Sequence, residues 1–184
     1  MSGVFVAIVG PSGVGKDSML RFAQERLGER VTLVRRVVTR SANGNVEEHD
    51  SLSEEAFRQA EQDGTFALSW SAHGLSYGLP ISLEDDLARG QIVLANLSRR
   101  VIPQLMALYP DALVVSVTAD RAEIAERLHK RGRETPESVE ARLSRTIAGD
   151  PLPASTIVID NSGALEVAGE LLVRLLQDML GVSA

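Results

Sequence analysis

Short apolar runs alternate with amphipathic segments along the whole chain. Five runs have the length and the content of β-branched residues typical of buried strands: 4–9, 31–39, 91–96, 112–119 and 155–160. Between them, apolar residues recur at helical spacing in a second set of segments: 17–28, 53–64, 82–90, 100–109, 120–132, 135–149 and 164–180. Several of these predicted helices begin with acidic residues or end at glycine, as helices commonly do.

The order of these elements predicts the architecture. Regular alternation of strands and helices is typical of a doubly wound α/β domain with a mostly parallel sheet, here of five strands. The stretch 40–80 is less apolar, and Gly74 and Gly78 predict turns within it. We therefore expect one domain of 1–184 with two insertions. A flap would cover about 40–80 and a small lid about 129–137, with the core at about 1–39 and 81–184.

Composition narrows the classes of partner. The 184 residues are 44% apolar, which suits a soluble globular domain with a well-formed core. The absence of cysteine excludes disulfide bonds and thiolate metal sites. A net charge of -6 argues against nucleic acid or an anionic membrane as a partner. Because no signal peptide and no apolar run of membrane-spanning length is evident, we expect a cytoplasmic protein.

The strongest local signal is "AIVGPSGVGKDS" at residues 7–18. An apolar strand runs into a glycine-rich loop and a helix follows, as in the P-loops that bind nucleotide phosphates. Glycines let backbone N–H groups turn toward phosphate oxygens, and a lysine adds positive charge for the β- and γ-phosphates. The predicted nucleotide-binding residues are consecutive: Gly10, Pro11, Ser12, Gly13, Val14, Gly15, Lys16, Asp17 and Ser18.

Asp17 stands where the commonest form of this loop has a serine or threonine hydroxyl for Mg²⁺. Phosphates would repel a carboxylate in direct contact, so Asp17 is expected to point elsewhere. Two interpretations stay open. The carboxylate binds Mg²⁺ in place of the missing hydroxyl, or it stabilises the N-terminus of the helix. Ser18, one position later, can still reach a phosphate oxygen, as in P-loop kinases that act on small molecules.

Arginines gather near the predicted strand ends and in the insertions. The candidates for a phosphate clamp, with one lysine among them, share such a position: Arg35, Arg36, Arg40, Arg99, Arg100, Arg127, Lys130, Arg131, Arg133, Arg142 and Arg145. Any one of them could equally be a solvated surface charge. Together they stand where doubly wound folds bind ligands, and phosphoryl transfer depends on neutralising negative charge.

Four motifs together resemble the guanylate kinase family over nearly the whole chain: "GPSGVGK", "TR" at 39–40, "HGLSYG" at 73–78 and "RLHKRGRETPESVEARL" at 127–143. The resemblance implies that the first motif binds ATP, with Mg²⁺ as the accompanying metal. It implies that Arg40 and Tyr77 hold the phosphate of the acceptor. Arg131 and Arg142 would belong to a lid over ATP, and with Lys16 they are the predicted catalytic residues.

The sequence departs from the guanylate kinase pattern at the positions that would recognise the acceptor. Where guanylate kinases read their base with carboxylates, this chain has "FAL" at 66–68 and "ANL" at 95–97, and leucine accepts no hydrogen bond from guanine. Added positive charge suits a second phosphate instead. With "LSW", "NLSR" and "RGRE", the pattern resembles the kinases of ribose 1,5-bisphosphate. That resemblance implies ATP-dependent phosphorylation of the 1-phosphate to give 5-phosphoribosyl 1-diphosphate, in phosphonate catabolism.

The predicted acceptor site collects residues from the flap and from the ends of the second and third strands: Arg35, Arg36, Arg40, His73, Tyr77, Asn96, Ser98 and Arg99. The expected partners are ATP and a small sugar bisphosphate, and a homodimer is left open. Two other functions also stay open. One is a nucleoside monophosphate kinase that reads its base differently. The other is a non-catalytic binding module, against which the presence of Lys16 argues. The roles of His49 and Trp70 stay open between ligand contact and ordinary packing.

Overall fold

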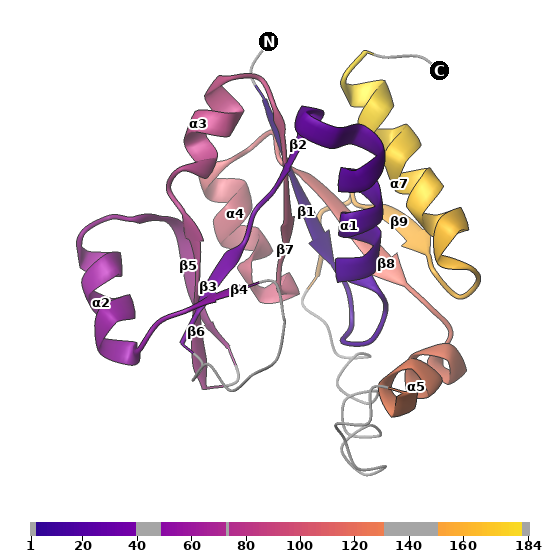
Figure 1. Ribbon diagram of the computed structural model, residues 1–184, viewed down its shortest axis with the longest axis horizontal. Coiled ribbons are helices and arrows are strands. Elements are labelled where there is room, and N and C mark those ends of the chain that lie inside the picture. Colours follow the sequence, from indigo (N-terminus) through magenta and orange to yellow (C-terminus); the bar gives the residue numbers. More distant parts are fainter. Residues whose placement is uncertain (1–2, 40–48, 73, 131–150, 182–184) are drawn as a thin grey trace.

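A five-stranded parallel sheet forms the centre of the computed structural model, which describes residues 3–39, 49–72, 74–130 and 151–181 (Figure 1). Its strands, in spatial order, are β2 (Val31–Leu33), β7 (Ile92–Asn96), β1 (Val4–Val9), β8 (Leu113–Thr118) and β9 (Ile157–Asp160). Every adjacent pair is parallel. Strand β1 lies in the middle and is buried on both faces from Phe5 to Val9, as its continuous apolar run predicts.

Helices cover both faces of the central sheet. They and two 3-10 turns have these bounds: α1 (Lys16–Leu27), η1 (Gly28–Arg30), α3 (Leu83–Ala88), η2 (Arg99–Val101), α4 (Ile102–Leu108), α5 (Arg121–Lys130) and α7 (Leu165–Met179). Side chains of α1, α5 and α7 pack with Val6 and Ile8 on one face. Those of α3 and α4 pack with Phe5, Ala7 and Val9 on the other. These layers are those of a doubly wound α/β fold, so the predicted fold class is confirmed.

A second sheet stands beside the central one and has four strands, in the order β4 (His49–Ser51), β3 (Arg36–Val38), β6 (Leu75–Pro80) and β5 (Phe66–Ala72). Strands β5 and β6 form an antiparallel hairpin. Helix α2 (Glu54–Gln62) begins after Ser53, whose hydroxyl accepts a hydrogen bond from the Ala56 N–H at 3.1 Å. Phe57 of α2 stacks on Phe66 of β5, with 4.7 Å between ring centroids, so this helix packs on the second sheet.

The prediction of a single strand over 31–39 is wrong. The run divides into β2 of the central sheet and β3 of the second sheet, with Val34 and Arg35 between them. The Val34 N–H still donates to the Leu94 carbonyl at 2.9 Å, and the chain then leaves β7 to pair with β4 and β6. Apolar residues continue across the break because both strands bury side chains, and the hydrophobic pattern therefore did not reveal it.

The predicted turn at Gly78 is also wrong, whereas the turn at Gly74 is confirmed. Gly74 has a φ of +75° between β5 and β6. Gly78 lies inside β6 opposite Val37 and Ser69, and a Cβ there would stand 2.6 Å from the ring of Phe66. This glycine allows close packing within the sheet.

Some sequence predictions fall outside the described residues, among them the helix expected at 135–149. The limits of the flap and the lid stay predictions. Within the described part of the chain, no helix is long and apolar enough to span a membrane.

Candidate active site

The loop between β1 and α1 holds its backbone in conformations that suit glycine. Gly13 and Gly15 have φ values of +86° and +97°, which residues with a Cβ rarely adopt. A Cβ on Gly13 would lie 2.9 Å from the side chain of Leu128, and a Cβ on Gly15 would lie 2.5 Å from Nδ2 of Asn161. Because α1 begins directly after this loop, a phosphate here would meet both backbone N–H groups and the positive end of a helix dipole.

The Lys16 ammonium lies against the same loop. Its Nζ donates hydrogen bonds to the carbonyl oxygens of Gly10, at 2.8 Å, and Pro11, at 2.9 Å. Both acceptors are neutral. Phosphate oxygens carry negative charge and bind an ammonium more strongly, so a bound nucleotide can displace these two contacts.

A cleft of about 290 Å³ opens between the loop and the second sheet. Its lining combines the loop, the start of α1, the second sheet and the end of β7: Gly10, Ser12, Gly13, Gly15, Lys16, Asp17, Arg36, Trp70, Ala72, Tyr77, Asn96, Leu97 and Ser98. The cleft lies beyond the carboxyl ends of β1 and β7, where doubly wound folds bind their ligands. A molecule in it can contact the phosphate loop and the second sheet at the same time.

The second sheet contributes an aromatic wall that carries a positive charge. Trp70 and Tyr77 face each other across the β5–β6 hairpin and stack, with ring centroids 5.3 Å apart and planes at 9°. The Arg36 guanidinium lies 5.9 Å from the centroid of the Tyr77 ring. Such a wall offers an apolar surface for a sugar ring and a cation for a phosphate.

Asp17 turns toward the end of β7. Its Oδ1 accepts a hydrogen bond from Nδ2 of Asn96 at 2.6 Å, and both residues line the cleft. Mg²⁺ in nucleotide sites usually takes one or two carboxylates together with phosphate oxygens and waters, so one carboxylate at this position fits the metal. Among the described side chains, no group of three or more His, Cys, Asp or Glu residues could hold a metal ion.

Two predicted arginines lie away from the cleft lining. Arg35 forms an exposed ion pair with Asp50, at 3.5 Å, and lines a smaller cavity of about 30 Å³ next to Asp17. Arg99 donates from Nη2 to the Ser116 hydroxyl at 3.3 Å. Of the predicted acceptor residues, the structure thus brings the following into the cleft: Arg36, Tyr77, Asn96 and Ser98.

Other residues that the sequence predicts for the site lie outside the cleft lining or outside the described residues. Ser18 is exposed on α1 and is not part of the cleft lining. Leu68 and Ala95, expected where guanylate kinases read their base, are 2% and 0% exposed and belong to the apolar core, so neither faces the cleft. Four predicted site residues lie outside the described residues: Arg40, His73, Arg131 and Arg142.

Sequence analysis did not predict that Asn161 and Arg127 support the phosphate loop through the Val14 carbonyl. The Val14 carbonyl accepts hydrogen bonds from Asn161 Nδ2, at 2.7 Å, and from Arg127 Nη1, at 3.4 Å. Asn161 directly follows β9, and a polar residue at the carboxyl end of a strand of the parallel sheet is the signal that could have identified it. Trp70, whose role the sequence left open, is part of the cleft wall.

Comparison with known proteins gives the family. No family model matches the chain. The ribose 1,5-bisphosphate phosphokinase PhnN of Chelativorans sp. (strain BNC1) is 47% identical over 178 residues, which are 95% of this chain and 85% of that protein. The protein of the same name from Pseudomonas fluorescens (strain SBW25) is 46% identical over 173 residues, 90% of each chain. The chain belongs to the ribose 1,5-bisphosphate phosphokinase family.

Two solved structures share the fold of this member of the ribose 1,5-bisphosphate phosphokinase family. A guanylate kinase from Anaplasma phagocytophilum has a TM-score of 0.69 at 20% identity, covering 97% of this chain and 86% of that one. A gluconokinase from Sinorhizobium meliloti 1021 has a TM-score of 0.52, also at 20% identity, covering 100% and 98%. At this identity the likeness shows the fold alone, and the guanylate-kinase-like scaffold expected from the sequence is confirmed.

Proposed function

We propose that this protein transfers the γ-phosphate of ATP to the 1-phosphate of ribose 1,5-bisphosphate, giving 5-phosphoribosyl 1-diphosphate and ADP. Membership of the ribose 1,5-bisphosphate phosphokinase family supports the acceptor. Within the structure, the proposal rests on the cleft that the donor and the acceptor would share. Its lining joins the phosphate loop to the wall of Trp70, Tyr77 and Arg36, and it includes Asn96 and Ser98. That arrangement suits a donor and an acceptor that both carry phosphates.

The reaction requires little from the protein beyond positioning the two substrates and neutralising their charge. An oxygen of the 1-phosphate forms a bond to the γ-phosphorus, while the bond from that phosphorus to the β–γ bridging oxygen breaks and ADP leaves. The second pKa of a phosphate monoester is about 6, so the nucleophile is largely a dianion at neutral pH and needs no general base. Catalysis then depends on in-line placement and on neutralising the charge that spreads over the transferred group.

On the donor side, the loop from Gly10 to Ser18 binds the phosphates of ATP. Lys16 moves from the carbonyls of Gly10 and Pro11 to the β- and γ-phosphates. Asp17, held by Asn96, is the residue that would hold Mg²⁺, which supplies neutralisation of phosphate charge when it is bound.

On the acceptor side, Arg36 and Tyr77 bind one phosphate of the sugar, and Asn96 and Ser98 bind near the other. Arg35, Arg40, His73 and Arg99 stay predictions from the sequence for this site. Arg131 and Arg142 stay predictions for a lid over ATP, and hydrogen exchange that slows there on adding ATP would support it. A cytoplasmic location and a homodimer also stay predictions.

A guanylate kinase is the alternative, and the cleft lining argues against it. Guanine presents N–H donors that a specific site must accept. The one carboxylate among the described lining residues is Asp17, beside the phosphate loop and bonded to Asn96. Trp70, Ala72 and Leu97 offer no side-chain acceptor, and the remaining acceptors of the described lining are neutral hydroxyl or amide oxygens: Ser12, Tyr77, Asn96 and Ser98.

The test is release of ADP from ATP, measured with ribose 1,5-bisphosphate, with GMP and without an acceptor. We expect a high rate with the sugar bisphosphate and a low rate with GMP, since each unpaired base donor costs roughly 1–3 kcal/mol. Arg36→Ala should raise the KM for ribose 1,5-bisphosphate far more than the KM for ATP. Arg174→Ala, which removes an exposed arginine on α7, is the matched control and should change neither. Equal catalytic efficiency with GMP and the sugar bisphosphate would contradict the proposal.

A further inference from the structure

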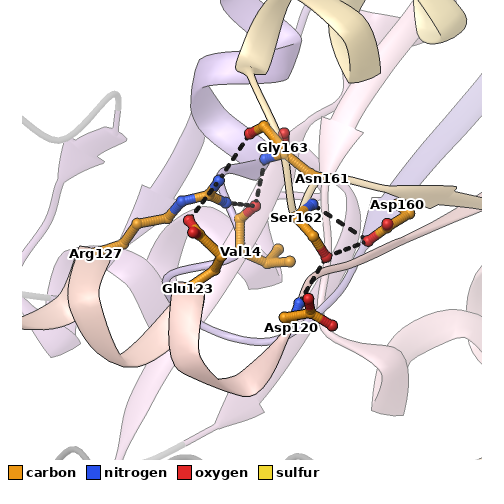
Figure 2. A network of polar contacts seen from close by, with 8 residues as sticks. All are labelled: Val14, Asp120, Glu123, Arg127, Asp160, Asn161, Ser162 and Gly163. Carbon is orange, nitrogen blue, oxygen red and sulfur yellow. Dashed lines mark hydrogen bonds and ion pairs between the residues drawn. The ribbon is translucent and has the colours of Figure 1, made fainter.

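The peptide that joins Val14 to Gly15 has its carbonyl directed toward Asn161 and Arg127 (Figure 2). Asn161 donates to the Val14 oxygen at 2.7 Å, and Arg127 adds a longer bond at 3.4 Å. Asn161 is 2% exposed, so its amide works in an apolar, water-poor setting where a hydrogen bond is strong. The orientation of that amide follows from its partner, because the reverse orientation would set two oxygens against each other.

A fixed carbonyl also fixes the next N–H. In a trans peptide the C=O of one residue and the N–H of the next point in opposite directions within one plane. The Gly15 N–H therefore points away from Asn161, and Gly15 itself lines the cleft together with Gly13 and Lys16. A flipped peptide would present the Val14 oxygen to the phosphates instead of an N–H.

Asn161 is itself held in place by the turn between β9 and α7. Its N–H donates to the Thr118 carbonyl at 2.7 Å. The next residue, Ser162, donates from its hydroxyl to Asp160 Oδ1 at 2.7 Å and accepts from the Asp120 N–H at 2.8 Å (Figure 2). Contacts from β8 and from the residue preceding α5 thus fix the turn on both sides.

Arg127 links the same turn to the loop. Its Nη2 donates to the Gly163 carbonyl at 3.3 Å and pairs with Glu123 at 3.5 Å. The guanidinium thereby spans from α5 to the Val14 carbonyl and to the turn (Figure 2).

We propose that Asn161 is a positioning residue that holds the Val14–Gly15 peptide with its N–H toward the phosphates of the bound nucleotide. This rests on the proposed function, because it takes the cleft beside Gly15 as the site of ATP phosphates. The buried Oδ1 of Asn161 accepts no hydrogen bond within the described residues. The side-chain amide therefore contributes only its N–H donor to Val14. Without that need, an apolar residue of similar size such as leucine would be usual at so buried a position.

The experiment measures the affinity for MgATP by calorimetry, across pH, for the whole protein and two variants. Asn161→Asp keeps the size but donates to Val14 only when the new carboxyl is protonated. Burial and the carboxylates of Asp120, Glu123 and Asp160 raise the pKa of such a group, and the Arg127 guanidinium opposes them. At about pH 8 we expect it to bind MgATP about tenfold or more weakly than the wild type. At about pH 5.5 the deficit relative to wild type should shrink. Asn161→Leu has no donor and folds without a buried charge, and its deficit should be independent of pH.

Ser162→Ala is the matched control, because it weakens the same turn without touching Val14. It should leave MgATP affinity close to that of the wild type. Wild-type affinity in Asn161→Leu, or a deficit in Asn161→Asp that does not change with pH, would overturn the inference. Failure of the wild type itself to bind MgATP would instead overturn the proposed function, so the two failures are distinct.

Discussion

Gly13 is the position in the phosphate loop at which the structure best defines the cost of adding a side chain. Its φ is +86°, and a Cβ added there would lie 2.9 Å from both Cγ and Cδ2 of Leu128, a buried residue of α5. Gly64, at the end of α2, offers a matched control. Its φ is +68°, and a Cβ there would have nothing within 4 Å.

Alanine at either position would adopt the same unfavourable left-handed backbone conformation but would contact different neighbours. A left-handed backbone costs a residue with a Cβ about 1–2 kcal/mol. Overpacking against a buried side chain adds about 1–3 kcal/mol. Gly64→Ala should therefore lower the free energy of unfolding by about 1–2 kcal/mol, and Gly13→Ala by about 2–5 kcal/mol.

Urea denaturation followed by far-UV circular dichroism gives both free energies of unfolding. The affinity for MgATP is the second measurement, because displacing Gly13 from Leu128 also displaces the loop. Gly13→Ala should weaken binding and Gly64→Ala should not. Equal losses of stability in the two variants would refute the claim that α5 packs directly against the loop.

Three further predictions concern other parts of the molecule. Lys16→Ala should lower turnover in the ADP-release assay by about 10²-fold or more, because its charge stabilises the transferred phosphate, while circular dichroism stays unchanged. Leu68→Glu should not create activity with GMP but should destabilise the protein by about 3–5 kcal/mol in urea, because it buries an unpaired charge in the core. Burial and the hydrogen bond to Glu84 raise the pKa of Tyr109 from 10.0 to about 12, so the folded state holds this proton more tightly than the unfolded state. Stability should then fall as pH rises from about 10 to about 12, and Tyr109→Phe should flatten that part of the urea-midpoint profile.

The sequence predicts the features that depend on local physics. A strand, three glycines and a lysine within one short segment identify the phosphate loop, because the backbone turn and the charge come from those residues themselves. The buried strands are equally predictable, since parallel strands covered on both faces leave uninterrupted apolar runs such as Val4–Val9.

Features that depend on tertiary contacts could not be predicted in the same way. Leu68 occupies a position that the family resemblance assigns to base recognition, yet its surroundings are the apolar core. Gly78 reads as a turn residue, but the ring of Phe66 is what excludes a side chain there. Asn161 contacts a residue 147 positions away, so its place directly after a strand does not reveal its bond to Val14.

The wall formed by Trp70, Tyr77 and Arg36 is connected to the phosphate loop through the backbone of the chain. Strand β3 begins only two residues after Val34, whose N–H still bonds to β7 of the central sheet, so Arg36 is anchored close to the loop. Tyr77 is in turn anchored to β3 by pairing with Val38, and Trp70 by stacking on Tyr77. These residues therefore shift as one unit with respect to the loop. Because a single substitution changes one side chain but not the placement of this unit, we expect acceptor specificity to depend on the position of the second sheet together with Asn96 and Ser98 at the end of β7.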